Sequence, residues 1–204
     1  MYKLYDFLPS GNGYKVRLLL TQLEISFELI LLNILKGETR TPEFLAKNPN
    51  GKIPVLEIEP NKFLSESNAI IYYLSQDTDY FPEDKYQQAR VMQWLFFEQY
   101  SHEPNIATPR FWITELKQPE KYKEQIEQKR KLGYAALKVM EQHLEKHDFF
   151  VADKYTIADI ALYAYTHVAD EGGFDLEGFP AIRTWFKRIE SQPNYITIDD
   201  SLDR

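Results

Sequence analysis

The sequence predicts a small α/β domain followed by an all-α domain, and three observations support this. Strand-like and helix-like apolar patterns alternate over residues 1–77. A polar stretch with one proline, residues 77–84, follows and is typical of an interdomain linker. Beyond it the strand signals stop, and apolar residues recur with the helical period. We therefore expect an α/β domain over residues 1–77 and a helical domain over residues 86–204.

The composition narrows the class of protein. The 204 residues are 44% hydrophobic and 27% charged, which is ordinary for a soluble globular chain. The absence of cysteine excludes disulfides, thiolate metal sites and a cysteine nucleophile, and a reducing cytoplasm is the simplest compartment for such a chain. The net charge of −7 argues against a nucleic-acid partner. No signal-peptide pattern opens the chain, and no apolar run approaches the roughly 20 residues of a membrane span, so no membrane association is expected.

The first part of the α/β domain is expected to contain two parallel strands joined by a helix. Residues 3–7 form the first strand, and residues 8–13 form a loop. A helix follows from about Tyr14, because apolar residues then recur at helical spacing. The nearly continuous apolar run over 27–32 predicts a buried strand that pairs in parallel with the first.

The second part of this domain reads as a helix, a hairpin and a helix. Thr41 and Pro42 are suited to the N-cap and first position of a short helix that ends before residue 48. Residues 53–58 and 63–64 predict a hairpin around a turn with a proline and an asparagine. A helix is expected over residues 67–75.

The helical domain carries two local signals. Thr156 and Asp159 have the spacing of a capping box, in which each side chain bonds to the backbone of the other. Pro180 begins a last helix with an apolar face. His143 and His147 lie four residues apart in a charged helix end, and we interpret them as solvated surface, so no metal site is predicted.

Four motifs, in this order along the chain, resemble the glutathione transferases over essentially the whole length. The family is identified from residues 10–17 (SGNGYKVR), 48–56 (NPNGKIPVL), 66–70 (ESNAI) and 156–159 (TIAD). The resemblance implies a thioredoxin-like first domain, a helical second domain and glutathione as co-substrate without a metal. Its finer features are similar to the serine-type bacterial classes, either zeta-like or chi-like.

The loop before the first helix is where the resemblance places the glutathione sulfur. A free thiol has a pKa of about 8.5, so a transferase must stabilise the thiolate, and a hydroxyl at a helix N-terminus does this. Ser10 matches the catalytic serine of the zeta-like pattern. The Asn12 side chain and the loop amides are alternatives. Tyr5 is a further alternative because some classes use a tyrosine near the end of the first strand, although it lies one residue out of that register.

The remaining glutathione contacts follow from the other motifs. The resemblance implies a cis Ile53–Pro54 bond, which turns the Ile53 backbone toward the cysteinyl part of glutathione. Ser67, at the start of a helix, suits the γ-glutamyl carboxylate, and Glu66 suits its ammonium group. Lys52 is a candidate for the glycine carboxylate, and Lys36 and Arg40 are alternatives.

An acceptor pocket is expected at the beginning of the helical domain. Prolines at 104 and 109 should break a helix there and expose aromatic side chains. The candidate lining residues are Tyr100, His102, Phe111, Trp112 and Tyr163.

The function implied by the resemblance is attack of the glutathione thiolate on small hydrophobic electrophiles by a cytoplasmic homodimer. The same thiolate would serve peroxide reduction or a glutathione-dependent isomerisation. Reduction of disulfides by a protein thiol is excluded without cysteine, but a reaction that uses two glutathiones is not. The alternative is a non-catalytic module of the same fold that binds glutathione, another ligand or a protein partner.

Overall fold

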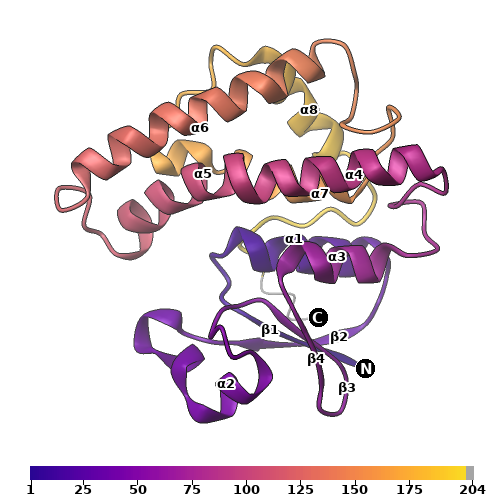
Figure 1. Cartoon of the computed structure of the whole chain (residues 1–204), viewed down its shortest axis with the longest axis vertical. Coiled ribbons are helices and arrows are strands. Elements are labelled where there is room, and N and C mark those ends of the chain that lie inside the picture. The colour runs from indigo at the N-terminus through magenta and orange to yellow at the C-terminus, as the bar shows by residue number, and fades with distance from the viewer. Residues whose placement is uncertain (201–204) are drawn as a thin grey trace. The chain divides into compact units, whose positions relative to one another are not determined.

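A computed structural model describes residues 1–200 of the chain (Figure 1). The chain divides into two compact units. The first comprises Met1–Asp77 together with the segment that starts at Pro193, and the second comprises Thr78–Gln192. The segment after Pro193 thus belongs with the α/β unit, whereas the sequence pattern places it at the end of the helical domain.

The first unit contains a four-stranded mixed sheet. Its strands are β1 (Tyr2–Asp6), β2 (Phe27–Leu31), β3 (Val55–Glu59) and β4 (Lys62–Ser65), in the order β2-β1-β3-β4. β1 and β2 are parallel, whereas β3 is antiparallel to β1 and to β4. This confirms the predicted α/β, thioredoxin-like arrangement. The prediction that β2 is a buried strand is wrong, because β2 is an edge strand and leaves Leu31 half exposed.

Three helices cover this sheet. Figure 1 shows α1 (Gly11–Gln22) and α3 (Ser67–Ser75) on one face and α2 (Pro42–Lys47) on the other. Two 3₁₀ turns, Ile34–Lys36 and Glu38–Arg40, precede α2. As predicted, Thr41 caps α2 by accepting a hydrogen bond from the Phe44 amide.

Helix α1 begins three residues earlier than the sequence pattern suggests. The Ser10 hydroxyl accepts a hydrogen bond from the Gly13 amide, so the residues before Tyr14 already form the first turn. Most of α1 is buried, and this includes Lys15 and Arg17, whose side chains have no exposed surface. An apolar stripe therefore identifies the helix but does not reveal that its other face is also covered.

The second unit is helical. Its helices are α4 (Lys85–Phe97), α5 (Glu103–Arg110), α6 (Lys123–Leu144), α7 (Ile157–Thr166) and α8 (Pro180–Glu190), with a 3₁₀ turn at Ala169–Gly172. Within residues 78–192 the extended pairing is limited to a bridge between Val151 and Lys154. Helix α7 lies at the centre of this unit, and every one of its residues is buried.

The two prolines near the start of this unit do not break the helix. Two π-helical turns, Glu98–His102 and Phe111–Glu115, join α4, α5 and the residues after it into one helical run. A proline removes one backbone donor, and a π turn shifts the bonding from i−4 to i−5, as between the Glu103 amide and the Glu98 carbonyl. The expected helix break is therefore wrong.

Candidate functional site

The loop between β1 and α1 presents Ser10 at the N-terminus of a helix. The Ser10 amide donates to the Phe7 carbonyl at 2.8 Å, and the Ser10 Oγ accepts from the Gly13 amide at 3.4 Å. A serine hydroxyl has two acceptor positions and one O–H donor. The cap uses one acceptor position, so the O–H can still donate to an anion in front of α1, where the helix dipole is positive.

Gly13 is required at its position by a close approach to β1. A Cβ atom at residue 13 would overlap the Asp6 carboxylate, which is itself fully buried. Asp6 accepts from the Phe7 amide at 2.7 Å and pairs with Arg17 at 3.0 Å. Burial raises the pKa of Asp6 to about 6, although the Arg17 charge and the Phe7 amide act in the opposite direction.

A chain of hydrogen bonds joins the first turns of α1 and α3. The Lys15 ammonium donates to the Ser67 Oγ at 3.3 Å and to the Asn68 Oδ1 at 3.2 Å. The Ser67 hydroxyl in turn donates to the Asn12 Oδ1 at 3.0 Å. The Asn12 carbonyl oxygen thus acts as an acceptor, and the donor group of this side chain, through which it would bind a thiolate, is its amide nitrogen.

Sequence reasoning identified Asn12 and Ser67 but missed Lys15 and Asn68. The signal that could have found Lys15 is its spacing, because residue 15 is one helical turn after Asn12 and shares its face. A buried ammonium beside the N-terminus of α3 makes this corner favourable for a carboxylate, since both contribute positive potential.

Glu66 occupies an unusual backbone conformation immediately before α3. Its φ of 70° and ψ of 110° lie outside the regions that L-residues normally populate. Such a conformation costs about 1–3 kcal/mol and is common at ligand sites. The Glu66 side chain is exposed, whereas Ser67 is buried, so the two predicted γ-glutamyl contacts lie on either side of the start of α3.

The Ile53–Pro54 peptide bond is cis, as the family resemblance implied. The loop before it is fixed by Asn48, whose side chain donates to the Lys52 carbonyl at 2.7 Å and accepts from the Asn50 amide at 3.1 Å. The Lys52 side chain is exposed and lies at the surface of this loop.

The alternative residues, Arg40 and Lys36 for the glycine carboxylate and Tyr5 for the thiolate, differ in their hydrogen bonds and exposure. Arg40 donates to the Asn50 carbonyl at 3.0 Å, and Lys36 is exposed on a 3₁₀ turn. The Tyr5 hydroxyl donates to the Glu57 carboxylate at 2.9 Å. Partial burial, followed by the bond to Glu57, raises the pKa of Tyr5 to about 12. Its single O–H is therefore directed to Glu57.

The predicted acceptor-pocket residues differ in how far they are buried within the helical unit. His102 and Tyr163 have no exposed surface and pack in the core: His102 Nε2 bonds to Thr166 Oγ1 at 2.8 Å, and Tyr163 donates to Glu190 at 3.3 Å. Trp112 stacks on Tyr122 at 4.5 Å. Of the other two, Tyr100 is 88% exposed and Phe111 is half-buried.

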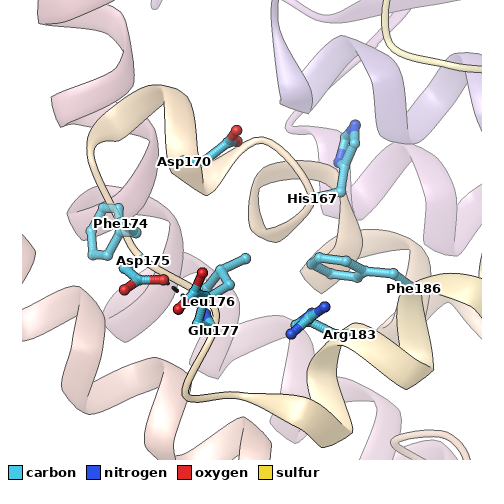
Figure 2. A pocket seen from close by; sticks show the side chains of 8 residues that line it. All are labelled: His167, Asp170, Phe174, Asp175, Leu176, Glu177, Arg183 and Phe186. Atoms are coloured by element: carbon cyan, nitrogen blue, oxygen red, sulfur yellow. Dashed lines mark hydrogen bonds between the residues drawn. The ribbon is translucent and has the colours of Figure 1, made fainter.

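A hollow of about 360 Å³ lies elsewhere in the helical unit, between the end of α7 and α8 (Figure 2). Its lining includes Asp170, Asp175 and Glu177 and the Arg183 guanidinium, with Phe174 and Phe186 as apolar residues. None of the predicted acceptor residues lines it, although the His167 ring stacks on Tyr163 at 4.4 Å. Over residues 1–200, no three His, Asp or Glu side chains are grouped to hold a metal ion, and no helix has the length and apolar character needed to cross a membrane.

Comparison with known proteins now defines the class. Residues 1–76 match the profile described as the glutathione S-transferase N-terminal domain, and residues 93–193 match the profile of the C-terminal domain. The chain belongs to the glutathione S-transferase family. The zeta-like or chi-like class remains a prediction.

Individual relatives cover nearly the whole chain. A crystal structure of a glutathione S-transferase from Pseudomonas fluorescens is 49% identical with a TM-score of 0.96, and covers 98% of this chain and 99% of its own. The disulfide-bond oxidoreductase YfcG of Escherichia coli is 32% identical over 95% of this chain and 92% of its own length. The glutathione transferase URE2P6 from Phanerochaete chrysosporium, solved with oxidized glutathione, is 31% identical with a TM-score of 0.84, and covers 95% of this chain and 92% of its own.

Proposed function

We propose that this chain is a cytoplasmic, homodimeric transferase that binds glutathione and activates its thiol for attack on small hydrophobic electrophiles. The observation that carries the proposal is the hydrogen-bonded corner formed by Asn12, Lys15, Ser67 and Asn68 at two helix N-termini, next to the Ser10 hydroxyl. Glutathione carries a carboxylate at each end and a thiol between them, so a site with positive potential at one end and a hydroxyl donor suits it. The proposal needs no metal.

The γ-glutamyl end of glutathione is assigned to the start of α3. Its carboxylate would accept from the Ser67 amide, and also from the Ser67 hydroxyl once its O–H turns from Asn12 to the ligand. It would lie within the positive potential of Lys15, and the ammonium of the ligand would pair with Glu66. The Ile53 backbone would pair with the cysteinyl residue beside Pro54, and Lys52 would face the glycine carboxylate. Each charged end of the ligand then has a partner of opposite charge.

The thiolate is assigned to the Ser10 hydroxyl, with Asn12 as its rival. A hydrogen bond to a charged acceptor is worth about 1.5–3 kcal/mol. Since about 1.4 kcal/mol corresponds to one pKa unit, such a bond lowers the thiol pKa by about one to two units from 8.5. A substantial share of bound glutathione is then ionised at neutral pH.

A second candidate reaction is disulfide reduction with two glutathiones, favoured by the name of the Escherichia coli relative and by the oxidized glutathione bound to URE2P6. The first thiolate attacks a disulfide sulfur, which forms a mixed disulfide and releases one substrate thiolate. A second glutathione thiolate then attacks the mixed disulfide, which yields oxidized glutathione and the other thiol. The sequence contains no cysteine, so both thiolates must come from glutathione.

The proposal is tested by turnover and binding measured side by side. Wild-type protein should bind glutathione in calorimetry and should turn over one of a panel of electrophiles, hydroperoxides and small disulfides. Ser67→Ala and Glu66→Gln should each weaken glutathione binding, because each leaves a charged end of the ligand less well paired. Ser75→Ala, the same change at the other end of α3, is the matched control and should bind as wild type does.

Two outcomes would contradict parts of this proposal. If Ser67→Ala and Glu66→Gln both bind glutathione as tightly as Ser75→Ala does, the γ-glutamyl assignment is wrong. If glutathione binds but no substrate in any class is turned over, the non-catalytic binding module is the better description.

A further inference from the structure

The end of the described chain is fastened to α1 through its backbone carbonyl groups. We call residues Pro193–Asp200 the C-terminal strap. The Ile196 carbonyl accepts from the Tyr14 hydroxyl at 2.7 Å, and the Ile198 and Asp200 carbonyls accept from Arg17 at 3.0 and 3.1 Å. Ile196 and Ile198 are also buried as side chains, so the strap is part of the packed α/β unit.

The guanidinium of Arg17 holds three separate pieces of chain at once. It is fully buried, and besides the strap it donates to the Asp6 carboxylate at 3.0 Å and to the Leu8 carbonyl at 2.7 Å. A planar guanidinium with five N–H donors can make such bonds simultaneously, whereas the ammonium of a lysine cannot span them. Arg17 therefore links the end of β1, the following loop and the C-terminal strap.

The loop that Arg17 holds is the one that carries Ser10. Leu8 lies two residues before Ser10, and the Ser10 amide bonds to Phe7, whose own amide is held by Asp6. The positions of Leu8 and Phe7 are therefore both set by the Asp6–Arg17 pair. A displacement of about 1 Å at a reacting group can reduce a rate by about a hundredfold, so this anchoring bears on chemistry.

We propose that Arg17 is a positioning residue and that the C-terminal strap, through Arg17, is required to hold the Ser10 hydroxyl where it can donate to the glutathione thiolate. The inference rests on the proposed function, in which Ser10 donates to that thiolate. Without the strap, two of the carbonyls on Arg17 are replaced by water. The buried Arg17 guanidinium then loses its fixed orientation, and Leu8 and Ser10 lose theirs.

The experiment compares two deletions and two substitutions in the full-length protein. Deletion of residues 195–204 removes the carbonyls that bind Tyr14 and Arg17, whereas deletion of residues 203–204 is the matched control. Arg17→Lys keeps the positive charge beside Asp6, and Tyr14→Phe removes the hydroxyl that donates to the Ile196 carbonyl. The measurements are kcat, KM for glutathione, and the pKa of the bound thiol followed by the ultraviolet absorbance of the thiolate.

The long deletion and Arg17→Lys should lower kcat by about tenfold or more while KM for glutathione changes by less than about twofold. The pKa of the bound thiol should return toward about 8.5. Tyr14→Phe should give a smaller shift in the same direction, and the short deletion should give none. Tyr14→Phe keeps the test valid if the long deletion does not fold.

Three results would overturn the inference or separate it from the proposed function. A folded long deletion or Arg17→Lys variant with the wild-type thiol pKa overturns it, and so does a loss of kcat without any change in that pKa, because that indicates only a smaller folded fraction. An unshifted Tyr14→Phe variant overturns the role of the strap. If the wild-type protein itself binds glutathione with an unlowered thiol pKa, the proposed function has failed instead.

Discussion

The two units use buried charged groups in different ways. In the helical unit, buried acids accept backbone amides: Asp159 takes the Thr156 and Phe150 amides at 3.0 and 3.2 Å, and Glu141 takes two amides at the start of α8. In the α/β unit, the buried Asp6 accepts one amide in the same way, but two buried cations of α1 donate as well. Lys15 and Arg17 reach side chains and carbonyl groups close to the Ser10 loop.

The buried acids contribute mainly to stability, whereas the buried cations contribute mainly to the binding site. An acid that satisfies the amides of a helix start fixes where that helix begins, which is a contribution to stability. A cation that holds a loop or borders an anion site shapes what the unit can bind. We therefore expect removal of the buried acids to lower stability and removal of groups around α1 to lower turnover with a smaller effect on folding.

The largest effect is expected for Asp159→Ala. The Asp159 carboxylate also accepts from the Trp185 indole at 2.9 Å and from the Thr156 hydroxyl at 3.2 Å. Its removal leaves buried donors without an acceptor, which should cost about 3–5 kcal/mol of unfolding free energy. Urea denaturation at neutral pH measures this loss, and a cost below about 1 kcal/mol would contradict the architectural role.

Asp159 should also make the stability of the protein depend on pH. Burial raises its pKa from 3.8 to about 6, against the opposing effect of its hydrogen bonds. Because the pKa is raised in the folded state, the folded protein binds this proton more strongly than the unfolded chain does. The resulting contribution to the free energy of unfolding is fully present below pH about 4 and is lost as the pH rises through about 6. Because Asp159→Asn does not titrate, its cost should be greatest near pH 4 and smaller by roughly 3 kcal/mol at neutral pH. A cost that does not change with pH would contradict the shift.

The next effect, on turnover, concerns Ser10. Ser10→Ala removes one hydrogen bond to a charge, worth about 1.5–3 kcal/mol, so kcat at neutral pH should fall by about ten- to a hundredfold. The loss should shrink as the pH rises and the thiol ionises unaided. If Asn12 holds the thiolate, Asn12→Ala will show this behaviour and Ser10→Ala will not. Glutathione affinity measured for both variants shows whether the change is confined to the sulfur.

A smaller loss of stability is expected at Glu141. Its two carboxylate oxygens accept from the Ala181 and Ile182 amides at 2.8 and 2.9 Å. Glu141→Gln keeps one acceptor and points an NH₂ group at the other amide, which should cost about 1–2 kcal/mol. Glu145→Gln, on the exposed end of the same helix, is the control and should be near neutral. Thermal melts distinguish the two, and turnover per folded molecule should not change.

Features set by neighbouring residues could be predicted from the sequence, whereas features set by distant residues could not. The capping box is a local signal, and the structure confirms it: Thr156 and Asp159 bond to each other's backbone. The cis bond at Pro54 could be predicted only from the family resemblance. Spacing places Lys15 on the same helix face as Asn12, but the distant partners of Lys15 and Arg17 could not be predicted. Ser67 and Ile198 lie 52 and 181 residues away from them along the chain, and a local pattern does not bring such residues together.

The smallest effect is expected for Tyr5→Phe, which tests whether the thiolate is held at β1 or at α1. The Tyr5 hydroxyl donates to Glu57, and its pKa of about 12 keeps it protonated at neutral pH. This partly exposed bond should contribute less than about 1 kcal/mol to stability. Because the one O–H is directed to Glu57, the variant should keep kcat within about twofold of wild type and should show the same pH profile. Tyr2→Phe, on the same strand, is the matched control. A tenfold or greater loss of kcat in Tyr5→Phe with an altered pH profile would move the thiolate donor from Ser10 to Tyr5.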